Sequence, residues 1–483
     1  MSIDWLPFSL PKKFRVGDPS SLLSKAAEIE VSRSPDYRLS ITAIGGGAPK
    51  RDKLDTEAIR ERIDLDLLGE PFLQGKLIGY FPSNLSTNFK FKDAPVTKEN
   101  GIADRLHIFY RKSETATAIT EWVVNFPDDR HWPRTTDRES IVTEWIERDS
   151  AKIRENVLKT SSASHDHARI NLDLPTVSFI RFGQITTDQV NEPFKVKRPG
   201  FIEYSAGGKG LPDEKLRYSI RMALAFIFGC GFGVLGRTET SADGYPIVAT
   251  AISAFIPGGE NFPTPPVLLH ERSLDDVDEA LVTEFLKRYI QCEAVKQLDL
   301  AVWLYLYSFS APLNMAAGYL GGAFEILRRY FYSLASNEHK TRLLPKTIWK
   351  TISSEIFNTI DKIIVTEKQV EFASQLEEIK SRVGGLNSVS GTKLNTLLLE
   401  DLGIQYGIIE QDALKARNDS VHANSLGSEG YLETLRRKKA LHTLVARVFF
   451  RVLQFDDIYY LDYSALDPST LRPTPKLLNK KQG

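Results

Sequence analysis

The apolar residues of this chain change their spacing at one short segment, residues 256–266, with the sequence IPGGENFPTPP. Its four prolines and two glycines exclude regular secondary structure, so we expect an interdomain linker. Before it, short runs of β-branched and aromatic residues are typical of strands, whereas after it apolar residues recur at helical spacing. The sequence predicts an α+β protein, with a β-rich domain over residues 1–265, an all-α bundle over 266–470 and a flexible tail over 471–483.

The first domain is predicted to consist mainly of β-sheet, and it forms either one domain or two subdomains. Helices are expected over residues 137–157 and from Pro212 onward, and mobile connections at 86–100 and 165–171. Predicted strands span residues 39–44, 76–81, 106–110, 119–126, 177–182, 201–205 and 245–255. After the linker, predicted helices span residues 274–308, 315–334, 346–365, 368–382, 393–402, 408–424 and 428–453.

The length and composition limit the kinds of function that the chain can have. A chain of 483 residues exceeds what one hydrophobic core organises, which agrees with two or three domains. Lysine plus arginine number 62, as do aspartate plus glutamate, so nucleic-acid binding must come from a local patch. The two cysteines, Cys230 and Cys292, are too few for a disulfide framework, and the first residues lack the features of a signal peptide. A cytoplasmic location is expected.

Two apolar stretches invite comparison with membrane spans. Residues 222–236 are too few to cross a bilayer. Residues 300–324 are long enough, but Pro312 and several polar residues and glycines interrupt them. We therefore expect two buried helices that meet at Pro312, and no membrane association.

Residues 417–422, RNDSVH, lie in a predicted helix and combine two groups suited to cleaving RNA. RNA carries its own nucleophile, the ribose 2′-OH, so an enzyme has to remove that proton and neutralise the charge developing on the phosphate. His422 can transfer protons near neutral pH, and Arg417 binds phosphate oxygens while staying charged. On a helix Asn418 and His422 share a face, one turn apart. This chemistry needs neither a metal ion nor a cofactor, and none is expected.

The spacing of Arg417 and His422 is by itself a weak signal, because Arg437 and His442 repeat it one helix later. The asparagine directly after Arg417 distinguishes the first pair from the second. An arginine, a polar residue, three further residues and a histidine on a helix resemble the motif of the HEPN superfamily of ribonucleases. The segments AAGYLGGAFEILRRYF before the motif and LVARVFFRVLQFDDIYYLDY after it resemble the flanking helices of that superfamily.

The layout of the whole chain, a larger region followed by the helical bundle, is similar to ApeA-type abortive-infection proteins of bacterial antiviral defence. The resemblance implies a toxin-like endoribonuclease that leaves a 2′,3′-cyclic phosphate, with tRNA as one candidate target. It also implies a homodimer or higher oligomer with a composite site, and a first domain that senses a phage-derived trigger. The residues assigned are Arg417, Asn418 and His422 as catalytic, Glu325 and Asp419 as supporting, and Arg436, Arg437, Lys438 and Lys439 as RNA-binding.

The alternative is a non-catalytic HEPN protein whose bundle mediates assembly while the first domain binds a partner. In that case Arg417 and His422 would form structural pairs with carboxylates such as Asp412 and Asp419.

Several further patterns have structural interpretations. The dinucleotide-type fingerprint at residues 231–236 follows a predicted helix and is expected to end it, and residues 207–210 are expected to form a strand turn. His165 and His167 are expected in a solvated loop, and His107 is expected to pack within a strand.

Overall fold

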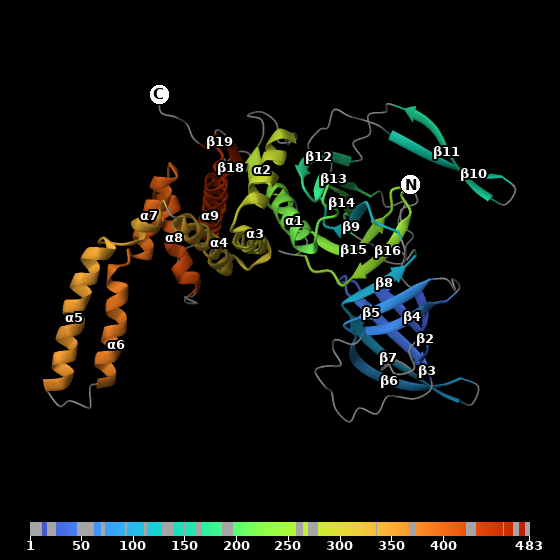
Figure 1. Cartoon of the computed structure of the whole chain (residues 1–483), viewed down its shortest axis with the longest axis horizontal. Coiled ribbons are helices and arrows are strands. Elements are labelled where there is room, and N and C mark those ends of the chain that lie inside the picture. The colour runs from blue at the N-terminus through green and yellow to red at the C-terminus, as the bar shows by residue number, and fades with distance from the viewer. Residues whose placement is uncertain are drawn as a thin grey trace. The chain divides into compact units, whose positions relative to one another are not determined.

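The computed structural model of the chain divides into two compact units, Met1–Gln291 and Cys292–Gly483 (Figure 1). The first is rich in strands and the second in helices, so the predicted α+β class is confirmed. The residues that the structure describes are 12–16, 26–45, 62–68, 73–91, 94–110, 114–127, 140–148, 151–160, 167–185, 197–256, 264–268, 279–334, 336–366, 373–421, 431–456, 458–466 and 473–478.

The first unit is built on a sheet of 14 described strands, all paired antiparallel, in the order β12-β13-β14-β9-β15-β16-β8-β5-β4-β1-β2-β3-β7-β6. A separate hairpin joins β10 to β11. The strand bounds are β1 Lys12–Val16, β2 Ala26–Arg33, β3 Leu39–Gly45, β4 Arg62–Leu67, β5 Gln74–Ile78, β6 Phe81–Phe91, β7 Ala94–Ala103, β8 Arg105–Phe109, β9 Ala118–Val124, β10 Ser140–Arg148, β11 Ala151–Thr160, β12 His167–Leu174, β13 Val177–Gln184, β14 Gly200–Ala206, β15 Gly233–Thr240, β16 Pro246–Ile252 and β17 Val267–Leu268.

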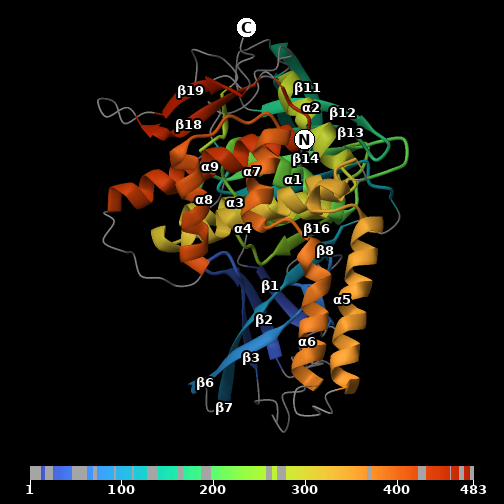
Figure 2. The ribbon, with the colours of Figure 1, turned by 90° about the vertical axis from the view of Figure 1, so that its left-hand side faces the viewer.

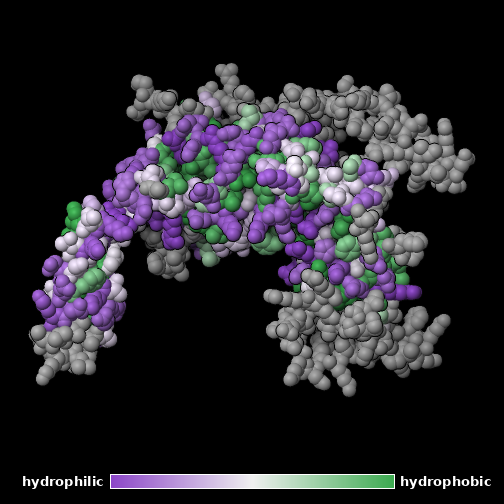
Figure 3. Space-filling view, in the orientation of Figure 1, coloured by the Kyte–Doolittle hydropathy of each residue, from purple (hydrophilic) through white to green (hydrophobic). Residues whose placement is uncertain are grey.

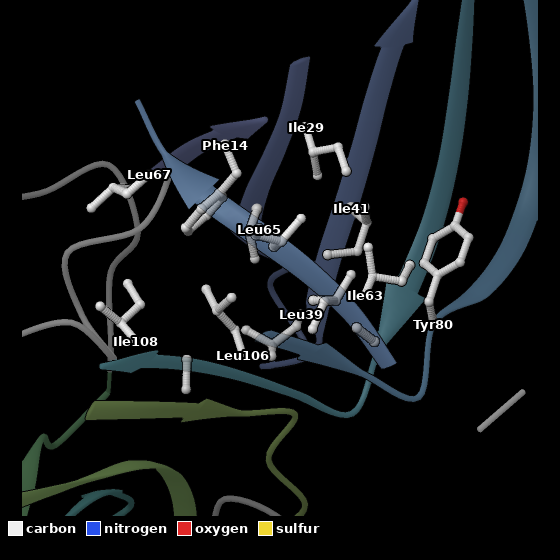
Figure 4. Packing of buried hydrophobic residues seen from close by; sticks show 14 of the residues in the cluster. Phe14, Ile29, Leu39, Ile41, Ile63, Leu65, Leu67, Tyr80, Leu106 and Ile108 are labelled. Atoms are coloured by element: carbon white, nitrogen blue, oxygen red, sulfur yellow. The ribbon is translucent and has the colours of Figure 1, made fainter. Parts of the chain in front are cut away.

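The early strands enclose an apolar core within this unit. Their residues alternate between buried and partly exposed, as in β3 and β8, which is the pattern of a sheet with one face inward. Phe14, Ile41 and Leu106 come from three different strands and are fully buried in one cluster. Figure 4 shows such side chains converging on a shared interior. Burial of this cluster holds the N-terminal strands together.

Helix α1 (Glu214–Phe228) lies between β14 and β15 in the sequence and has well-defined ends. The side chain of Asp213 accepts a hydrogen bond from the backbone N–H of Leu216 at 2.8 Å, which caps the helix start. Gly229 ends the helix with φ 63°, a left-handed conformation that favours glycine. A strand follows this helix, whereas a dinucleotide fingerprint requires a strand before a helix, so the predicted helix end is confirmed.

A buried ion network fixes α1 to the sheet. Glu121 on β9 accepts hydrogen bonds from Arg217 Nε and from the hydroxyl of Tyr204, each at 2.9 Å. Arg221 pairs with the same carboxylate. The Glu121 and Arg217 side chains are only 3% and 4% exposed, so each charge depends on the other for compensation.

Helix α2 (Glu279–Gln291) belongs to the first unit although it follows the proline-rich segment. Phe285 stacks on Phe226 of α1, with ring centroids 5.8 Å apart, and Lys287 lies 4.0 Å from Asp173 of β12. This packing places the division of the chain after Gln291, whereas the sequence indicates residue 265.

The second unit is organised around α4, which packs against α3, α8 and α9 (Figure 2). The second half of α9, residues 440–450, is buried throughout and forms the centre of the unit. The bounds are α3 Val295–Ser310, α4 Leu313–Ser333, η4 Glu338–Thr341, α5 Lys346–Thr366, α6 Ala373–Val383, η6 Gly384–Asn387, α7 Gly391–Asp401, α8 Ile408–Val421, α9 Tyr431–Val452, β18 Tyr459–Leu466 and β19 Pro473–Leu477.

Helices α5 and α6 form a hairpin that displays apolar side chains. Asn387 closes its base, because its side-chain amide bonds both the N–H and the carbonyl of Leu344, at 2.7 and 3.0 Å. Ile348 and Ile352 are 50% and 38% exposed, and Figure 3 shows hydrophobic surface on this hairpin. Ile360 is 7% exposed and forms part of the small core between the helices.

The helices of the second unit agree closely with the prediction, and α3 and α4 are separated at Pro312 as expected. The predicted helix 274–308 is instead two helices, α2 and α3, separated at residues 292–294. Among the described residues, no helix is long and apolar enough to cross a membrane.

Three predictions for the first unit were wrong. Residues 137–157 were expected to be helical, but their described part belongs to β10 and β11, where Glu147 stands opposite Lys152. Charged residues favour helices in isolation, yet opposite charges also suit facing positions on paired strands. The expected loop at 86–100 contains parts of β6 and β7, and the expected connection at 165–171 contains the start of β12. β6 and β12 stand at the two ends of the described sheet order, and β12 buries Ala168, Ile170 and Leu172 on one face.

The C-terminal region also differs from an all-α bundle with a flexible tail. α9 ends at Val452, and β18 and β19 form a hairpin after it. Lys476 pairs with Asp462, and Leu478 is 2% exposed, so the described residues 473–478 are packed rather than free.

Candidate functional site

Helix α8 carries the first part of the RNDSVH motif. Its start is stabilised by a hydrogen bond from the backbone N–H of Gly407 to Glu410, at 2.8 Å, an arrangement in which a side chain satisfies an otherwise unpaired donor. Ala413 is 1% exposed where α8 packs into the unit, and α8 contacts both α4 and α9. The helix is therefore held by its own cap and by two neighbours.

The backbone of Arg417, Asn418 and Asp419 is helical and lies within the last turns of α8, which ends at Val421. Their side chains and the whole of His422 lie outside the described part of the structure. The helical position predicted for the arginine and asparagine is thus confirmed. The assignment of these residues and His422 to catalysis stays a prediction.

The second arginine–histidine pair has a structural explanation. His442 is 3% exposed, its Nε2 lies 3.0 Å from the hydroxyl of Ser308, and its ring stacks on Phe309 with centroids 4.5 Å apart. Burial, followed by the charges of Lys438 and Lys439, holds the pKa of His442 well below its ordinary value. A neutral, buried imidazole does not meet RNA, which agrees with its interpretation as an accidental match.

Arg437 and Glu325 each form ion pairs within their own helix. Arg437 Nε lies 3.5 Å from Glu433. Glu325 pairs with Arg328, at 3.8 Å, and with Arg329. The carboxylate of Glu325 thus forms ion pairs with two arginines of α4. Any supporting role of Glu325 at the site has to be compatible with these two ion pairs.

The basic residues at the start of α9 differ in their surroundings. Arg436 is exposed, whereas Lys438 and Lys439 are half-buried. The pKa of Lys438 is lowered by burial and by the charge of Lys439, and burial lowers the pKa of Lys439. Burial is thus the first cause of both pKa shifts, and these two lysines are less accessible than Arg436.

Three basic residues elsewhere in the second unit form contacts within the protein. Arg328 is 9% exposed and donates to the carbonyl of Gly391 at 2.9 Å, which ties α4 to α7. Lys340 pairs with Asp401, and Arg342 with Glu338, each at 2.7 Å. These contacts favour structural roles for Arg328, Lys340 and Arg342.

Two residues that the sequence did not single out lie beside the basic residues at the start of α9. Tyr431 and Leu432 are 70% and 77% exposed on the first turn of α9. The sequence signal that could have identified them is an aromatic residue a few positions before a basic stretch, within a predicted helix.

His107 packs as predicted. Its Nδ1 lies 2.9 Å from the hydroxyl of Thr250 across β8 and β16, and its ring stacks on Phe109. The expected turn at residues 207–210 is also present, closed by backbone hydrogen bonds between Gly207 and Gly210. His165 lies outside the described residues, and His167 begins β12.

Comparisons of the chain with family models, with curated proteins and with solved structures find no match.

Proposed function

We propose that the chain is a metal-independent endoribonuclease of the HEPN type that acts in antiviral defence by abortive infection. The observation that carries the proposal is the RNDSVH sequence, whose Arg417 and Asn418 lie on the next-to-last helix of a helical unit. The burial of His442 supports it further, because the competing pair is explained by packing.

In this mechanism His422 takes the proton of the ribose 2′-OH or protonates the leaving 5′-oxygen. Arg417 stabilises the negative charge that develops on the phosphate, and Asn418 orients the phosphate or the imidazole. The 2′-oxygen attacks the adjacent phosphorus and the bond to the 5′-oxygen breaks, so the products are a 2′,3′-cyclic phosphate and a 5′-hydroxyl. A homodimer, in which two motifs face each other, completes the site.

The strand-rich first unit is the proposed sensor, and a phage-derived trigger is its proposed ligand. A nuclease that cleaves cellular RNA has to be restrained until infection. Residues 1–291 form a compact unit of their own, which supports assigning the control surface to that unit.

The test is cleavage of tRNA, mRNA and rRNA by the purified full-length protein in excess chelator. Wild type should produce fragments with cyclic phosphate ends, whereas His422→Ala and Arg417→Ala should lose about 100-fold or more of the rate. His339→Ala, at an exposed histidine of the same unit, is the matched control and should cleave normally.

Intact RNA with wild type, in the presence of lysate from phage-infected cells, would overturn the proposal. Equal cleavage by His422→Ala would overturn it as well. In either case, the non-catalytic assembly protein becomes the better description.

A further inference from the structure

The hairpin of α5 and α6 buries few of its own apolar side chains. In the described part of the chain, α5 packs chiefly against α6, and Figure 2 shows the two helices side by side. Among the side chains that the structure describes on these helices, only Ile360 and Val383 are buried, at 7% and 3% exposure. An amphipathic helix needs another element against which to bury its apolar side, and one neighbour covers only part of α5.

The uncovered apolar residues lie on one side of α5. Ile348, Ile352 and Ile363 are 50%, 38% and 41% exposed. Successive residues of an α-helix are about 100° apart around the axis, so these three side chains fall within an arc of about 60°. They extend over about 22 Å along the axis, and the buried Ile360 lies about 60° beyond Ile363. Apolar residues grouped in this way mark an interaction surface, unlike single exposed ones.

Two opposite charges follow the edge of this apolar group. Glu355 and Lys362 are both exposed, and each lies within about 40° of Ile348 around the axis. They are seven residues, or about 10 Å, apart along the helix. Thr359 lies between them, and its hydroxyl donates to the carbonyl of Glu355 at 2.9 Å. A partner can therefore cover Thr359 without leaving its hydroxyl unpaired.

This order of charges is complementary to itself when two copies of α5 run in opposite directions. In an antiparallel pair centred beside Thr359, Glu355 faces the partner's Lys362, and Lys362 faces the partner's Glu355. The same register brings Ile352 within about 3 Å, along the axis, of the partner's Ile363. A parallel pair would set like charges against each other, and a nucleic acid would meet the negative charge of Glu355.

We propose that the α5 surface, formed by Ile348, Ile352, Glu355, Lys362 and Ile363, binds the same surface of a second copy of this chain in the antiparallel direction. With α6 of each copy, the contact completes a bundle of four helices that encloses the apolar side of α5. Neither charged residue has to lack a neighbour in its own chain, because exposed ion pairs exchange partners at little cost.

The α5 surface is separate from the RNDSVH motif, whose described part lies on α8, and the inference does not rest on the proposed ribonuclease activity. A chain that pairs through both regions has two different two-fold contacts. Such a chain forms assemblies of four or more copies, whereas pairing through one region alone stops at a dimer.

The experiment measures the mass of the full-length protein by sedimentation velocity at about 1–100 μM. Glu355→Lys and Lys362→Glu each set like charges opposite each other across the pair. Each variant alone should raise the Kd of the contact about tenfold or more, and the double variant should restore it to within about threefold.

Mixing the two single variants tests the contact between chains directly. An equimolar mixture should recover the wild-type mass, because the lysines of one variant then face the glutamates of the other. A folding defect within one chain cannot be repaired in this way. Circular dichroism of each variant alone should match that of wild type, since both changes are on the surface.

Glu378→Lys is the matched control for the charge reversals. Glu378 is exposed on α6, about 140° around the axis from the buried Val383, and it pairs with Arg382. This variant should keep the wild-type mass. Ile352→Ser tests the apolar part of the surface and should raise the Kd about tenfold, whereas Ile352→Leu should keep it within about threefold.

A mass that is equal in wild type and Glu355→Lys at every concentration would overturn the inference, and a wild-type monomer throughout would do the same. Failure of the mixture to recover the wild-type mass would also overturn it. A protein that assembles through α5 but never cleaves RNA would refute the proposed function alone. Cleavage of RNA by a protein whose mass is indifferent to Glu355 would refute this inference alone.

Discussion

Nε2 of His442 lies 3.0 Å from the hydroxyl of Ser308, and this hydrogen bond joins α9 to α3 inside the second unit. The opposite ring nitrogen, Nδ1, is buried and has no hydrogen-bond partner among the described residues. A proton added there would place a charge in an apolar pocket formed in part by Tyr305 and Phe309.

The stability of the protein should therefore decrease in mild acid. Burial lowers the pKa of His442 in the folded chain, so the unfolded chain, with a pKa of about 6.5, takes up the proton first. The contribution of the neutral His442 to the free energy of unfolding is complete above about pH 6.5. Below that pH it decreases by up to about 1.4 kcal/mol per pH unit. Urea unfolding at several pH values should show a weaker pH dependence in His442→Leu. Identical dependence in both proteins would contradict the assignment.

Replacing Glu121 by glutamine should destabilise the first unit strongly. Burial alone would raise the pKa of Glu121, but Arg221 and Arg217 outweigh it and hold that pKa below its ordinary value. Without the carboxylate, two buried cations lose their partner, at a cost of about 3–5 kcal/mol in the free energy of unfolding. Urea unfolding followed by circular dichroism measures this cost.

The control for that substitution is Glu214→Gln, because the pair of Glu214 with Arg105 is exposed. It should change the free energy of unfolding by no more than about 0.5 kcal/mol. Because the folded pKa of Glu121 is lowered, its contribution is present above the unfolded value of about 4.3 and is lost as the pH falls through the folded value. Equal costs for the two variants would refute the role of the buried network.

Gly229→Ala should also be destabilising, for two reasons. The residue has φ 63°, which disfavours a side chain, and an added Cβ would lie 1.9 Å from the carbonyl oxygen of Thr264. We expect a loss of more than about 2 kcal/mol in the free energy of unfolding. Gly208→Ala is the matched change, since a Cβ there meets nothing within 4 Å, and its Tm should stay close to that of wild type. A normal Tm for Gly229→Ala would show that the helix end is not constrained as described.

The sequence predicted the helices of the second unit well because their apolar spacing continues over many turns. The bounds of α4, Leu313–Ser333, differ little from the expected 315–334. The strands were harder to predict. β15 follows α1 after a few residues, where the sequence predicted only the end of that helix, and β10 and β11 contain many residues that also suit helices. Whether such a segment forms a strand depends on its pairing with other strands, and the composition of the segment alone does not reveal that pairing.

The same distinction applies to the candidate site. The sequence placed Arg417 on a helix, as the structure does, and separated it from Arg437 by the asparagine that follows. The burial of His442 between Tyr305 and Phe309 depends on contacts between distant helices, which spacing along one helix does not contain. Likewise, the exposure of Tyr431 becomes evident only when its neighbours are in place.

The position of β8 in the sheet has a consequence for how the chain is made. Phe109 of β8 pairs with Val248 of β16, so two neighbouring strands are far apart in the sequence. At translation rates of about 5–20 residues per second, β8 waits roughly 7 to 28 seconds for this partner. Throughout that interval one edge of the growing sheet carries unpaired backbone groups, and the nascent protein is then most exposed to aggregation.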